Sequence, residues 1–405
     1  MRRIDLLSRL AKPADSKIVL LVLDGLGDLA TAAQPATALE IAATPALDDL
    51  ARRAHRPDRP GRRRHHSRQR PGHLSLFGYD PTEPEADIGR GILEALGLGL
   101  ALDARDVTAR GNFATADAAG NLVDRRAGRI PTAECVRVCD RLNEALAALS
   151  TEAGDRALGD AGEAPLRLPP ARRRSLRGAR RHRSQELGVP PLAARELTPD
   201  GAATATLVRR AVVAMEAAIA DEPRANRVLL RGFSRLPHLP PMPSLYRMRC
   251  GAFAGYPLYR GVASACGMEV VPCGKRIGEI LDVVAARWDD FDFFFLHVKQ
   301  TDQAGEDGDL ATKAKVIEEV DAELPRLLAL APDVLAVTGD HSTPAPMKAH
   351  SFHPVPLLVA AELAFVDRTT AFDGHQAAGH LGTFPGPELL GLLLAHAGRL
   401  EKYGA

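Results

Sequence analysis

Four short apolar runs constrain the fold of this chain more than any other feature of its sequence. They are KIVLLVL (17–23), FDFFFLH (291–297), DVLAVTG (333–339) and PVPLLVAA (354–361). Runs of this length predict strands buried on both faces of a parallel sheet. Helix-like patterns such as ALDDLARRA lie between them. Strands that alternate with helices predict an α/β sheet covered on both faces.

Polar residues follow three of these runs. The first run leads to Asp24, the second is soon followed by Asp302, and the third leads to Asp340 and His341. His350 comes just before the fourth run. Because ligands bind beyond the carboxyl ends of strands in open α/β sheets, we expect these side chains to meet at one edge of the sheet.

The carboxylates and imidazoles at these strand ends predict a two-metal site. Aspartate and histidine together suit Mn²⁺, Zn²⁺ or Mg²⁺. Two such ions can bind phosphate oxygens, lower the pKa of a nucleophile and offset charge during an in-line displacement. Each residue taken alone is commonly a helix cap, a turn former or a hydrogen-bonded structural residue. Their recurrence at successive strand ends favours a phosphoryl-transfer centre.

The length of the chain, 405 residues, predicts two domains. A stretch rich in Ala, Arg and Gly separates the first apolar run from the others, so we expect an inserted domain at 101–220 within a domain made of 1–100 and 221–405. The formal net charge of +1 gives no strong bias toward nucleic acid or membrane. The five cysteines form no CxxC pair and are expected to be reduced, which favours a cytoplasmic location.

Two arginine-rich segments show no helix or strand periodicity. Residues 52–70 hold nine arginines and residues 167–183 hold eight. Such blocks are typical of solvated basic loops. Runs of arginine can also bind nucleic-acid phosphates with an affinity that depends on salt. No aromatic residues are interleaved here and no known nucleic-acid module surrounds the blocks, so we expect no nucleic-acid partner and no membrane partner.

An ordered series of motifs resembles one family of enzymes. The series is LDGLGD (23–28), GHLSLFGYDP (72–81), GRGILEALG (89–97), RGNFAT (110–115), DRRAGRI (124–130), HVKQTDQAGEDGD (297–309), TGDHSTP (338–344) and HSFHPVPLL (350–358). It resembles the cofactor-independent phosphoglycerate mutases, most closely their archaeal-type branch within the alkaline phosphatase superfamily. The resemblance implies an alkaline-phosphatase-like doubly wound sheet with an inserted smaller α/β substrate domain.

The resemblance also implies a reaction. Members interconvert 3-phosphoglycerate and 2-phosphoglycerate in glycolysis and gluconeogenesis, without a requirement for 2,3-bisphosphoglycerate. A serine takes the phosphoryl group and returns it to the other hydroxyl, assisted by two divalent metals, commonly manganese. By position, one metal would be held by the serine with Asp24, Asp340 and His341. The other would be held by Asp302, Glu306 and His350. Glu306 stands where the family often has histidine, and its oxygen favours a harder ion.

Arginines of the inserted domain grip the substrate in this family. Arg125, Arg126 and Arg129 match that role, and Asp124 could bind a glycerate hydroxyl. The planar fork of arginine binds carboxylate and phosphate with two parallel hydrogen bonds. The same segment could instead be a solvated turn before a helix that begins near Pro131. Two further candidates for positioning phosphate, which could equally be surface charges, are Arg110 and Lys299.

The position of the expected nucleophile departs from the family. Members place the serine in a small-residue loop, typically Gly-Ile-Thr-Pro-Gly-Ser-Gly-Pro-Gly-His-Leu. Alignment on His73 and Leu74 puts Gln69 at the serine position. Glutamine cannot form a phosphoenzyme. Ser67 and Ser75 lie nearby, and either would substitute only if the loop were rebuilt.

This departure leads to a hypothesis about the gene. A one-base shift in codons for Ile-Thr-Pro-Gly-Ser-Gly-Pro can yield His-His-Ser-Arg-Gln-Arg-Pro, which is residues 65–71, and residues 180–185 behave similarly. Both arginine blocks would then be out-of-frame translation. Two alternatives to an active mutase therefore stand beside it. One is a metal-dependent phosphomonoesterase or another phosphotransferase of the superfamily, and the other is an inactive paralogue or a frameshift-damaged product.

We expect resequencing of the coding DNA to reveal compensating insertions and deletions around both arginine blocks. A shift at the start of a block and its reversal at the end would explain why the family motifs resume at GHLSLFGYDP (72–81) and QELGVPPL (185–192). The hypothesis fails if the reading frame is confirmed and alignment with close relatives shows no such changes nearby.

Overall fold

The chain divides into two compact units. In the computed structural model, the described residues are 1–53, 55–56, 69–83, 86, 88–102, 106–153, 165–168, 186–196, 201–234, 236, 238–362, 365–366, 369–373 and 382–404. The first unit comprises Met1–Asp87 with Leu239–Ala405, and the second comprises Ile88–His238. The units therefore divide near 87 and 238, whereas the sequence analysis places the division near 100 and 220.

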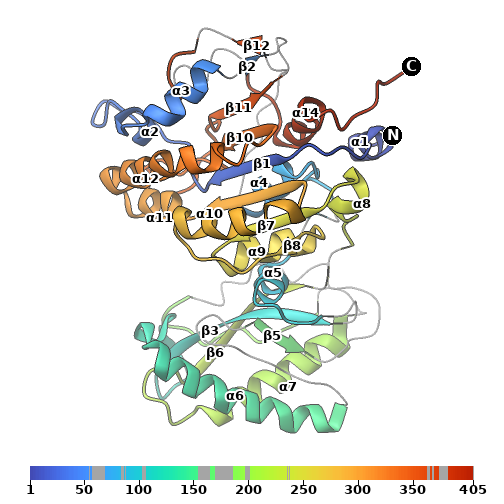
Figure 1. The fold of residues 1–405 in the computed structure, drawn as a ribbon. Coiled ribbons are helices and arrows are strands. Elements are labelled where there is room, and N and C mark those ends of the chain that lie inside the picture. The colour runs from blue at the N-terminus through green and yellow to red at the C-terminus, as the bar shows by residue number, and fades with distance from the viewer. Residues whose placement is uncertain are drawn as a thin grey trace. The chain divides into compact units, whose positions relative to one another are not determined.

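A six-stranded sheet forms the centre of the first unit (Figure 1). Its strand order is β11 (Leu357–Ala361), β10 (Val334–Thr338), β1 (Ile18–Leu23), β9 (Phe293–Val298), β7 (Cys250–Ala254) and β8 (Glu269–Val270). The strand β1 pairs in parallel with both β9 and β10. The predicted α/β class is thus confirmed, and each of the four apolar runs contains a strand.

The fourth apolar run forms a strand, but its direction differs from the prediction. The sequence predicts a parallel strand, whereas β11 pairs antiparallel with β10. A parallel partner needs a crossover connection, which is usually a helix. The connecting residues 339–356 are all described and contain turns and bends but no helix, so the chain returns in the opposite direction.

Helices cover both faces of this sheet because alternate strand residues point to opposite faces. On one face, Phe294 and Leu335 pack with Ile280 and Ile317 in a single apolar cluster. The opposite face of β9 includes Phe295, whose ring meets the ring of Phe77 edge-on at a centroid distance of 4.9 Å. Full burial of one such side chain contributes about 2 kcal/mol.

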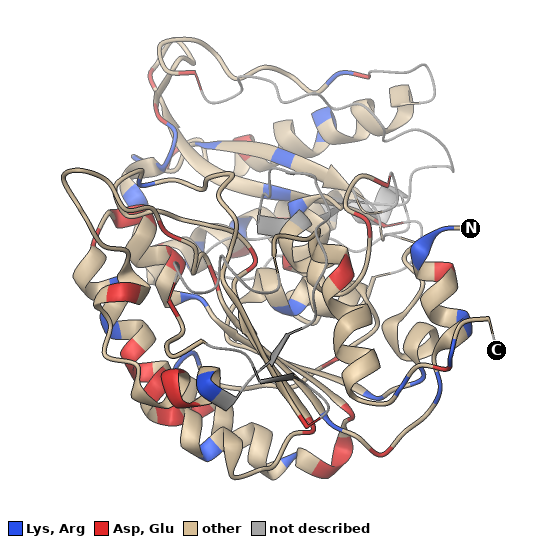
Figure 2. Cartoon of the chain, turned by 90° about the horizontal axis from the view of Figure 1, so that it is seen from above, with Lys and Arg blue, Asp and Glu red and all other residues tan. Residues whose placement is uncertain are grey.

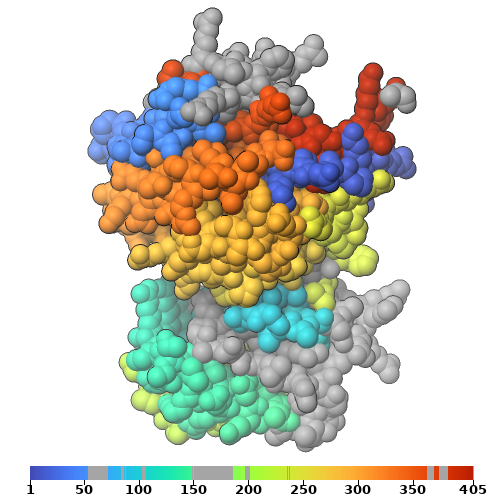
Figure 3. Space-filling model, in the orientation of Figure 1, coloured from blue at the N-terminus to red at the C-terminus, as the bar shows by residue number. Residues whose placement is uncertain are grey.

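The other elements of the first unit connect and cover these strands. They are α1 (Arg3–Leu10), α2 (Ala38–Ile41), α3 (Pro45–Arg53), β2 (His55–Arg56), α4 (Gln69–Leu76), α8 (Met242–Tyr246), α9 (Pro257–Ala265), α10 (Ile277–Ala286), η4 (Trp288–Asp290), α11 (Gln300–Asp307), α12 (Leu310–Leu328), β12 (Phe365–Val366), η5 (Gly386–Glu388) and α14 (Leu389–His396). The helices α2 and α3 lie beside α12, although far from it in sequence (Figures 1 and 3). Acidic and basic residues are interspersed along the described chain (Figure 2), in keeping with the near-neutral total charge.

The second unit is a smaller antiparallel sheet with helices. Its strands are β3 (Val107–Ala116), β4 (Leu122–Asp124), β5 (Pro165–Leu168) and β6 (Arg227–Ser234), and β3 pairs with the other three. Its helices are α5 (Arg90–Gly97), η2 (Ala127–Arg129), α6 (Thr132–Ala153) and α7 (Ala202–Ala218). Gly91 lets α5 approach β3, since a Cβ there would lie 2.9 Å from the Cα of Ala109.

The arginine-rich segments lie largely outside the described residues. Their described ends correct the expectation of loops, because residues 52–53 end α3, 55–56 form β2, 69–70 begin α4 and 167–168 end β5. Among the described residues, no helix is long and apolar enough to cross a membrane.

Candidate metal centre

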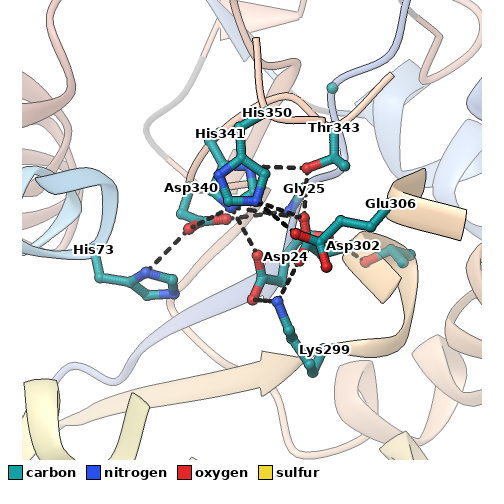
Figure 4. Close-up of polar contacts among 12 residues, drawn as sticks. Asp24, Gly25, His73, Lys299, Asp302, Glu306, Asp340, His341, Thr343 and His350 are labelled. Carbon is teal, nitrogen blue, oxygen red and sulfur yellow. Dashed lines mark hydrogen bonds and ion pairs between the residues drawn. The ribbon is translucent and has the colours of Figure 1, made fainter. Parts of the chain in front are cut away.

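Carboxylate and imidazole groups converge beyond the carboxyl ends of β1, β9 and β10 (Figure 4). They form two sets with one shared member. The first set is Asp24, Asp340 and His341, and the second is Asp302, His341 and His350. Within each set, one potential ligand atom from every residue lies within 4.8 Å of the others.

The parallel pairing of the three strands explains this convergence. Asp24 directly follows β1, Asp340 and His341 follow β10, and Asp302 lies in the first turn of α11 after β9. The chain turns sharply at Gly25, where φ is +66° and a Cβ would lie 2.8 Å from Asp302 Oδ1. Only glycine adopts this backbone conformation without a steric cost, so it allows the carboxylates to approach.

The aspartates are held in their ionised form. Burial would raise the pKa of Asp24, but the close polar contacts with His297 and His341 lower it well below its ordinary value. Burial likewise opposes the ionisation of Asp302, yet the nearby His350 imidazole contributes to lowering its pKa to about 2. Both side chains therefore carry negative charge at neutral pH.

His341 is protonated at neutral pH when no cation is bound. Burial would lower its pKa, but the charges of Asp340, Asp24 and Asp302 outweigh burial and raise the pKa to about 9. Its Nε2 lies 3.1 Å from Asp24 Oδ1 and 3.4 Å from Asp340 Oδ2. The imidazolium thus offsets part of the carboxylate charge, which a divalent cation would offset more fully.

The potential ligand atoms of the two sets suit a bound metal. In the described part of the chain, no partner meets hydrogen-bond geometry for either oxygen of Asp24, for Asp340 Oδ2, or for Nε2 of His341 and His350, although all are buried. Leaving such groups buried without compensation costs several kcal/mol. Anionic oxygens and imidazole nitrogens that converge in this way are the donor set of Mn²⁺ and Zn²⁺ sites.

Lys299 lies between two of the carboxylates. Its Nζ is 3.2 Å from Asp24 Oδ2 and also donates a hydrogen bond to Asp302 Oδ2. Burial would lower the pKa of Lys299, but the two aspartates raise it above its ordinary value. The alternative that Lys299 is a surface charge is therefore wrong, because its ammonium group is buried in the acidic cluster.

Glu306 lies next to the second set rather than within it. It stands one helical turn after Asp302 on α11, and its Oε1 is 3.4 Å from His350 Nε2. His350 Nε2 is in turn 3.4 Å from Asp302 Oδ1. The Glu306 side chain is half exposed.

Two buried histidines that the sequence analysis did not select contact the first set. His73 Nδ1 lies 3.1 Å from Asp340 Oδ2, and His297 Nε2 lies 3.2 Å from Asp24 Oδ2. The Tyr259 ring stacks on His297 at a centroid distance of 3.7 Å. Groups in such positions orient metal ligands. His73 could have been selected from its place in GHLSLFGYDP, and His297 from its place at a strand end. Nothing in the sequence around Tyr259 indicates a role at this site.

The position aligned with the missing serine lies within one helical turn of this centre. Gln69 begins α4, and Gly72 of the same helix packs so tightly on Asp340 that a Cβ would lie 2.4 Å from the Asp340 carbonyl oxygen. The Gln69 side chain and all of Ser67 fall outside the described residues. Ser75 is farther along α4 and packs against Gly386.

The substrate-binding candidates of the second unit form a constrained turn. Asp124 accepts hydrogen bonds from the backbone N–H groups of Arg126 and Gly128, at 2.8 and 2.5 Å. Ala127, Gly128 and Arg129 all have positive φ, at 50°, 62° and 51°. The side chains of Arg125, Arg126 and Arg129 are exposed. The segment is thus a turn before α6, which begins at Thr132, and the turn presents its arginines to solvent.

Arg110 is buried within the second unit. It is 6% exposed, and its Nη1 lies 3.5 Å from Glu94 Oε1. The alternative that Arg110 is a surface charge is therefore wrong. Its guanidinium faces an acidic partner inside the unit.

Known proteins resemble the chain over nearly all of its length. The Metalloenzyme superfamily matches residues 16–389. Proteins from Thermotoga neapolitana and Thermus thermophilus are 42% and 44% identical, each over 98% of both chains, and both carry the name "Probable 2,3-bisphosphoglycerate-independent phosphoglycerate mutase".

Solved structures share the fold. A protein from Pyrococcus horikoshii has a TM-score of 0.76 and 28% identity, over 96% of this chain and 99% of its own. A cofactor-independent phosphoglycerate mutase from Thermoplasma acidophilum has a TM-score of 0.65 and 24% identity, over 94% and 100%. The expected alkaline-phosphatase-like fold class with an inserted α/β unit is confirmed by this likeness.

We expect the affinity for Mn²⁺ to rise with pH up to about 9. His341 has a pKa of about 9 in the metal-free protein, and its Nε2 must lose a proton before it can bind a cation. Each pH unit below 9 should therefore weaken binding about tenfold. Calorimetric titration between about pH 6 and 8.5 measures the affinity and the protons released. Substitution His341→Gln should abolish this dependence, and the control His396→Gln on α14 should retain it.

The stability of the metal-free protein should instead fall as the pH rises. The raised pKa of His341 contributes stability that is fully present below its ordinary value of 6.5 and is lost as the pH rises through about 9. The increase in melting temperature on adding Mn²⁺ should therefore grow across this window. A metal-induced increase that stays constant with pH would show that His341 is not a ligand.

Proposed function

We propose that this chain, which belongs to the 2,3-bisphosphoglycerate-independent phosphoglycerate mutase family, carries a buried carboxylate and histidine centre suited to the interconversion of 3-phosphoglycerate and 2-phosphoglycerate, and that the altered nucleophile position limits its turnover. The observation that carries the proposal is the pair of ligand sets that share His341 beyond three adjacent strand ends. Relatives that carry the mutase name match 98% of the chain. The phosphomonoesterase alternative gains no support from them.

Two divalent metals would occupy the centre. Asp24, Asp340 and His341 would hold one. Asp302, Glu306 and His350 would hold the other. When bound, the ions would offset the charge of the phosphoryl oxygens and lower the pKa of the nucleophile. We propose Mn²⁺ over Zn²⁺, because the Glu306 carboxylate adds a hard oxygen donor, and Mg²⁺ would be accepted for the same reason.

The protein groups bind the substrate and fix its orientation. The Lys299 ammonium is charged and close to the acidic cluster, so it would contact a phosphoryl oxygen once cations replace it beside the carboxylates. The exposed arginines 125, 126 and 129 would bind the carboxylate of the glycerate. Asp124 accepts hydrogen bonds from two backbone amides, which supports a role in shaping this turn. We propose that Asp124 also contacts a glycerate hydroxyl.

The nucleophile position limits turnover by the chain as written. In the mutase reaction, an enzyme oxygen must form a bond to phosphorus while the substrate C–O–P ester is cleaved, and then return the group to the other hydroxyl. The carboxamide of Gln69 has no hydroxyl that could serve. We therefore propose that this chain binds metal and phosphoglycerate but turns over poorly, as an inactive paralogue or a frameshift product would.

We also propose that the protein acts on this small substrate in the cytoplasm. All five cysteines are free thiols, which suits a reducing compartment. The near-neutral net charge supports the absence of a nucleic-acid partner.

We expect replacement of residues 56–71 with the small-residue loop of the family to restore mutase activity. The replacement supplies both the serine and the glycines that allow a tight backbone path. The single substitution Gln69→Ser should not restore activity, because the flanking residues remain unchanged. Interconversion of the two phosphoglycerates, followed by ³¹P NMR, should be faster by at least about 10³-fold after loop replacement.

The same spectra separate the alternatives. Release of inorganic phosphate in place of interconversion would indicate a phosphomonoesterase. The replacement loop with alanine at the serine position is the matched control and should be inactive while still binding Mn²⁺. Robust mutase activity of the unaltered chain would refute the assignment of Gln69 to the nucleophile position.

A further inference from the structure

A lysine is buried behind the metal centre without contacting any of the proposed ligands. Lys313 lies on α12 and is 0% exposed. Its Nζ donates hydrogen bonds to the carbonyl oxygens of Gly27, at 3.0 Å, and Thr343, at 2.9 Å. Fully buried lysines are rare unless they are paired, because burial of the charge is costly. The contacts of Lys313 therefore need an explanation beyond packing.

The charge of Lys313 is balanced by Asp28, whose Oδ2 lies 3.6 Å away. The carboxylate of Asp28 also accepts hydrogen bonds from the backbone N–H groups of Ala38 and Ala345, both at 3.1 Å. One end of this network belongs to the loop after β1, and the other belongs to the loop after β10. Lys313 and Asp28 thus tie together the two loops that carry Asp24 and Asp340.

Thr343 connects this network to both ligand sets (Figure 4). Its hydroxyl donates a hydrogen bond to Asp302 Oδ1 at 2.5 Å and lies 3.1 Å from His341 Nδ1. Its backbone N–H donates to the carbonyl of Gly27 at 3.0 Å. A single side chain therefore contacts the histidine shared by the two sets and the aspartate of the second set.

We propose that Lys313 is a positioning residue for the metal centre and acts through Thr343. By holding the Thr343 carbonyl, Lys313 fixes the hydroxyl between Asp302 and His341. The hydroxyl has one proton, which it donates in the hydrogen bond to Asp302 Oδ1, so it accepts a hydrogen bond from His341 Nδ1–H. Because Nδ1 keeps its proton, the nitrogen that is deprotonated for metal binding is Nε2, which faces Asp24 and Asp340. The inference rests on the proposed metal function, because positioning has meaning only if a cation binds there.

The chemistry explains why this position requires lysine. An ammonium group has three donors, which match the two carbonyl oxygens and the Asp28 carboxylate. An apolar side chain of the same length would fill the space but would leave both carbonyls without this donor. The loops after β1 and β10 would then lose a shared anchor while the core kept its packing.

The test compares Mn²⁺ binding by metal-free protein with folding stability. The variants are Lys313→Met, Thr343→Val, their combination, and Thr343→Ser, which keeps the hydroxyl. Lys315→Met is the matched control, since Lys315 is exposed on the same helix. Titration calorimetry gives the affinity, and thermal unfolding without metal gives the stability.

We expect Lys313→Met and Thr343→Val each to weaken Mn²⁺ binding about 10- to 100-fold, as is typical when groups that orient metal ligands are removed. The double variant should lose little more than the more affected single variant, because both substitutions break one connection. Thr343→Ser and Lys315→Met should bind as the unaltered chain does. If Lys313→Met does not fold, Lys313→Gln replaces it, because its amide still donates to a carbonyl, and a smaller loss that is again non-additive with Thr343→Val is expected.

Two outcomes would overturn the inference. One is unchanged Mn²⁺ affinity in a Lys313 variant whose metal-free stability falls, which would make Lys313 purely structural. The other is a double variant whose losses add, which would mean that Lys313 does not act through Thr343. Absence of Mn²⁺ binding by the unaltered chain would instead refute the proposed metal centre itself, so the two failures are distinguishable.

Discussion

Mutual repulsion of buried aspartates is the interaction on which the site and its surroundings depend. Asp24, Asp302 and Asp340 are all buried beyond adjacent strand ends. Two carboxylates about 4 Å apart repel by about 4 kcal/mol at an effective dielectric of about 20, which is a large share of the stability of a typical domain. Two positively charged groups offset part of this repulsion, the ammonium of Lys299 and the imidazolium of His341. The structure stabilises these charges in the arrangement that divalent cations bind.

Much of this arrangement could be predicted from the sequence, because buried strands are encoded locally as apolar runs and their ends are visible as polar residues. The direction of β11 was not predictable in this way, since a buried apolar run reads the same in either direction. The strand β7 (Cys250–Ala254) was missed because small residues such as Gly251 and Ala252 give no apolar run. Lys313 and Tyr259 lie on helices and not at strand ends, and only packing brings them to the site.

The turn between β4 and α6 combines backbone strain with a local compensation. Positive φ at Ala127 and Arg129 costs about 1–3 kcal/mol each. The carboxylate of Asp124 offsets this cost by binding the backbone N–H groups of the same turn. The result is a hydrogen-bonded turn on which Arg125, Arg126 and Arg129 are exposed. Gln69 departs from the family at the start of α4, the helix whose Gly72 packs against Asp340.

Anomalous X-ray diffraction from crystals grown with Mn²⁺ tests the central claim most directly, because it locates the ions without reference to activity. We predict two manganese peaks in the first unit. One should lie among Asp24, Asp340 and His341, and the other among Asp302, Glu306 and His350. The absence of peaks at these side chains, or manganese bound only elsewhere on the chain, would contradict the proposed two-metal centre.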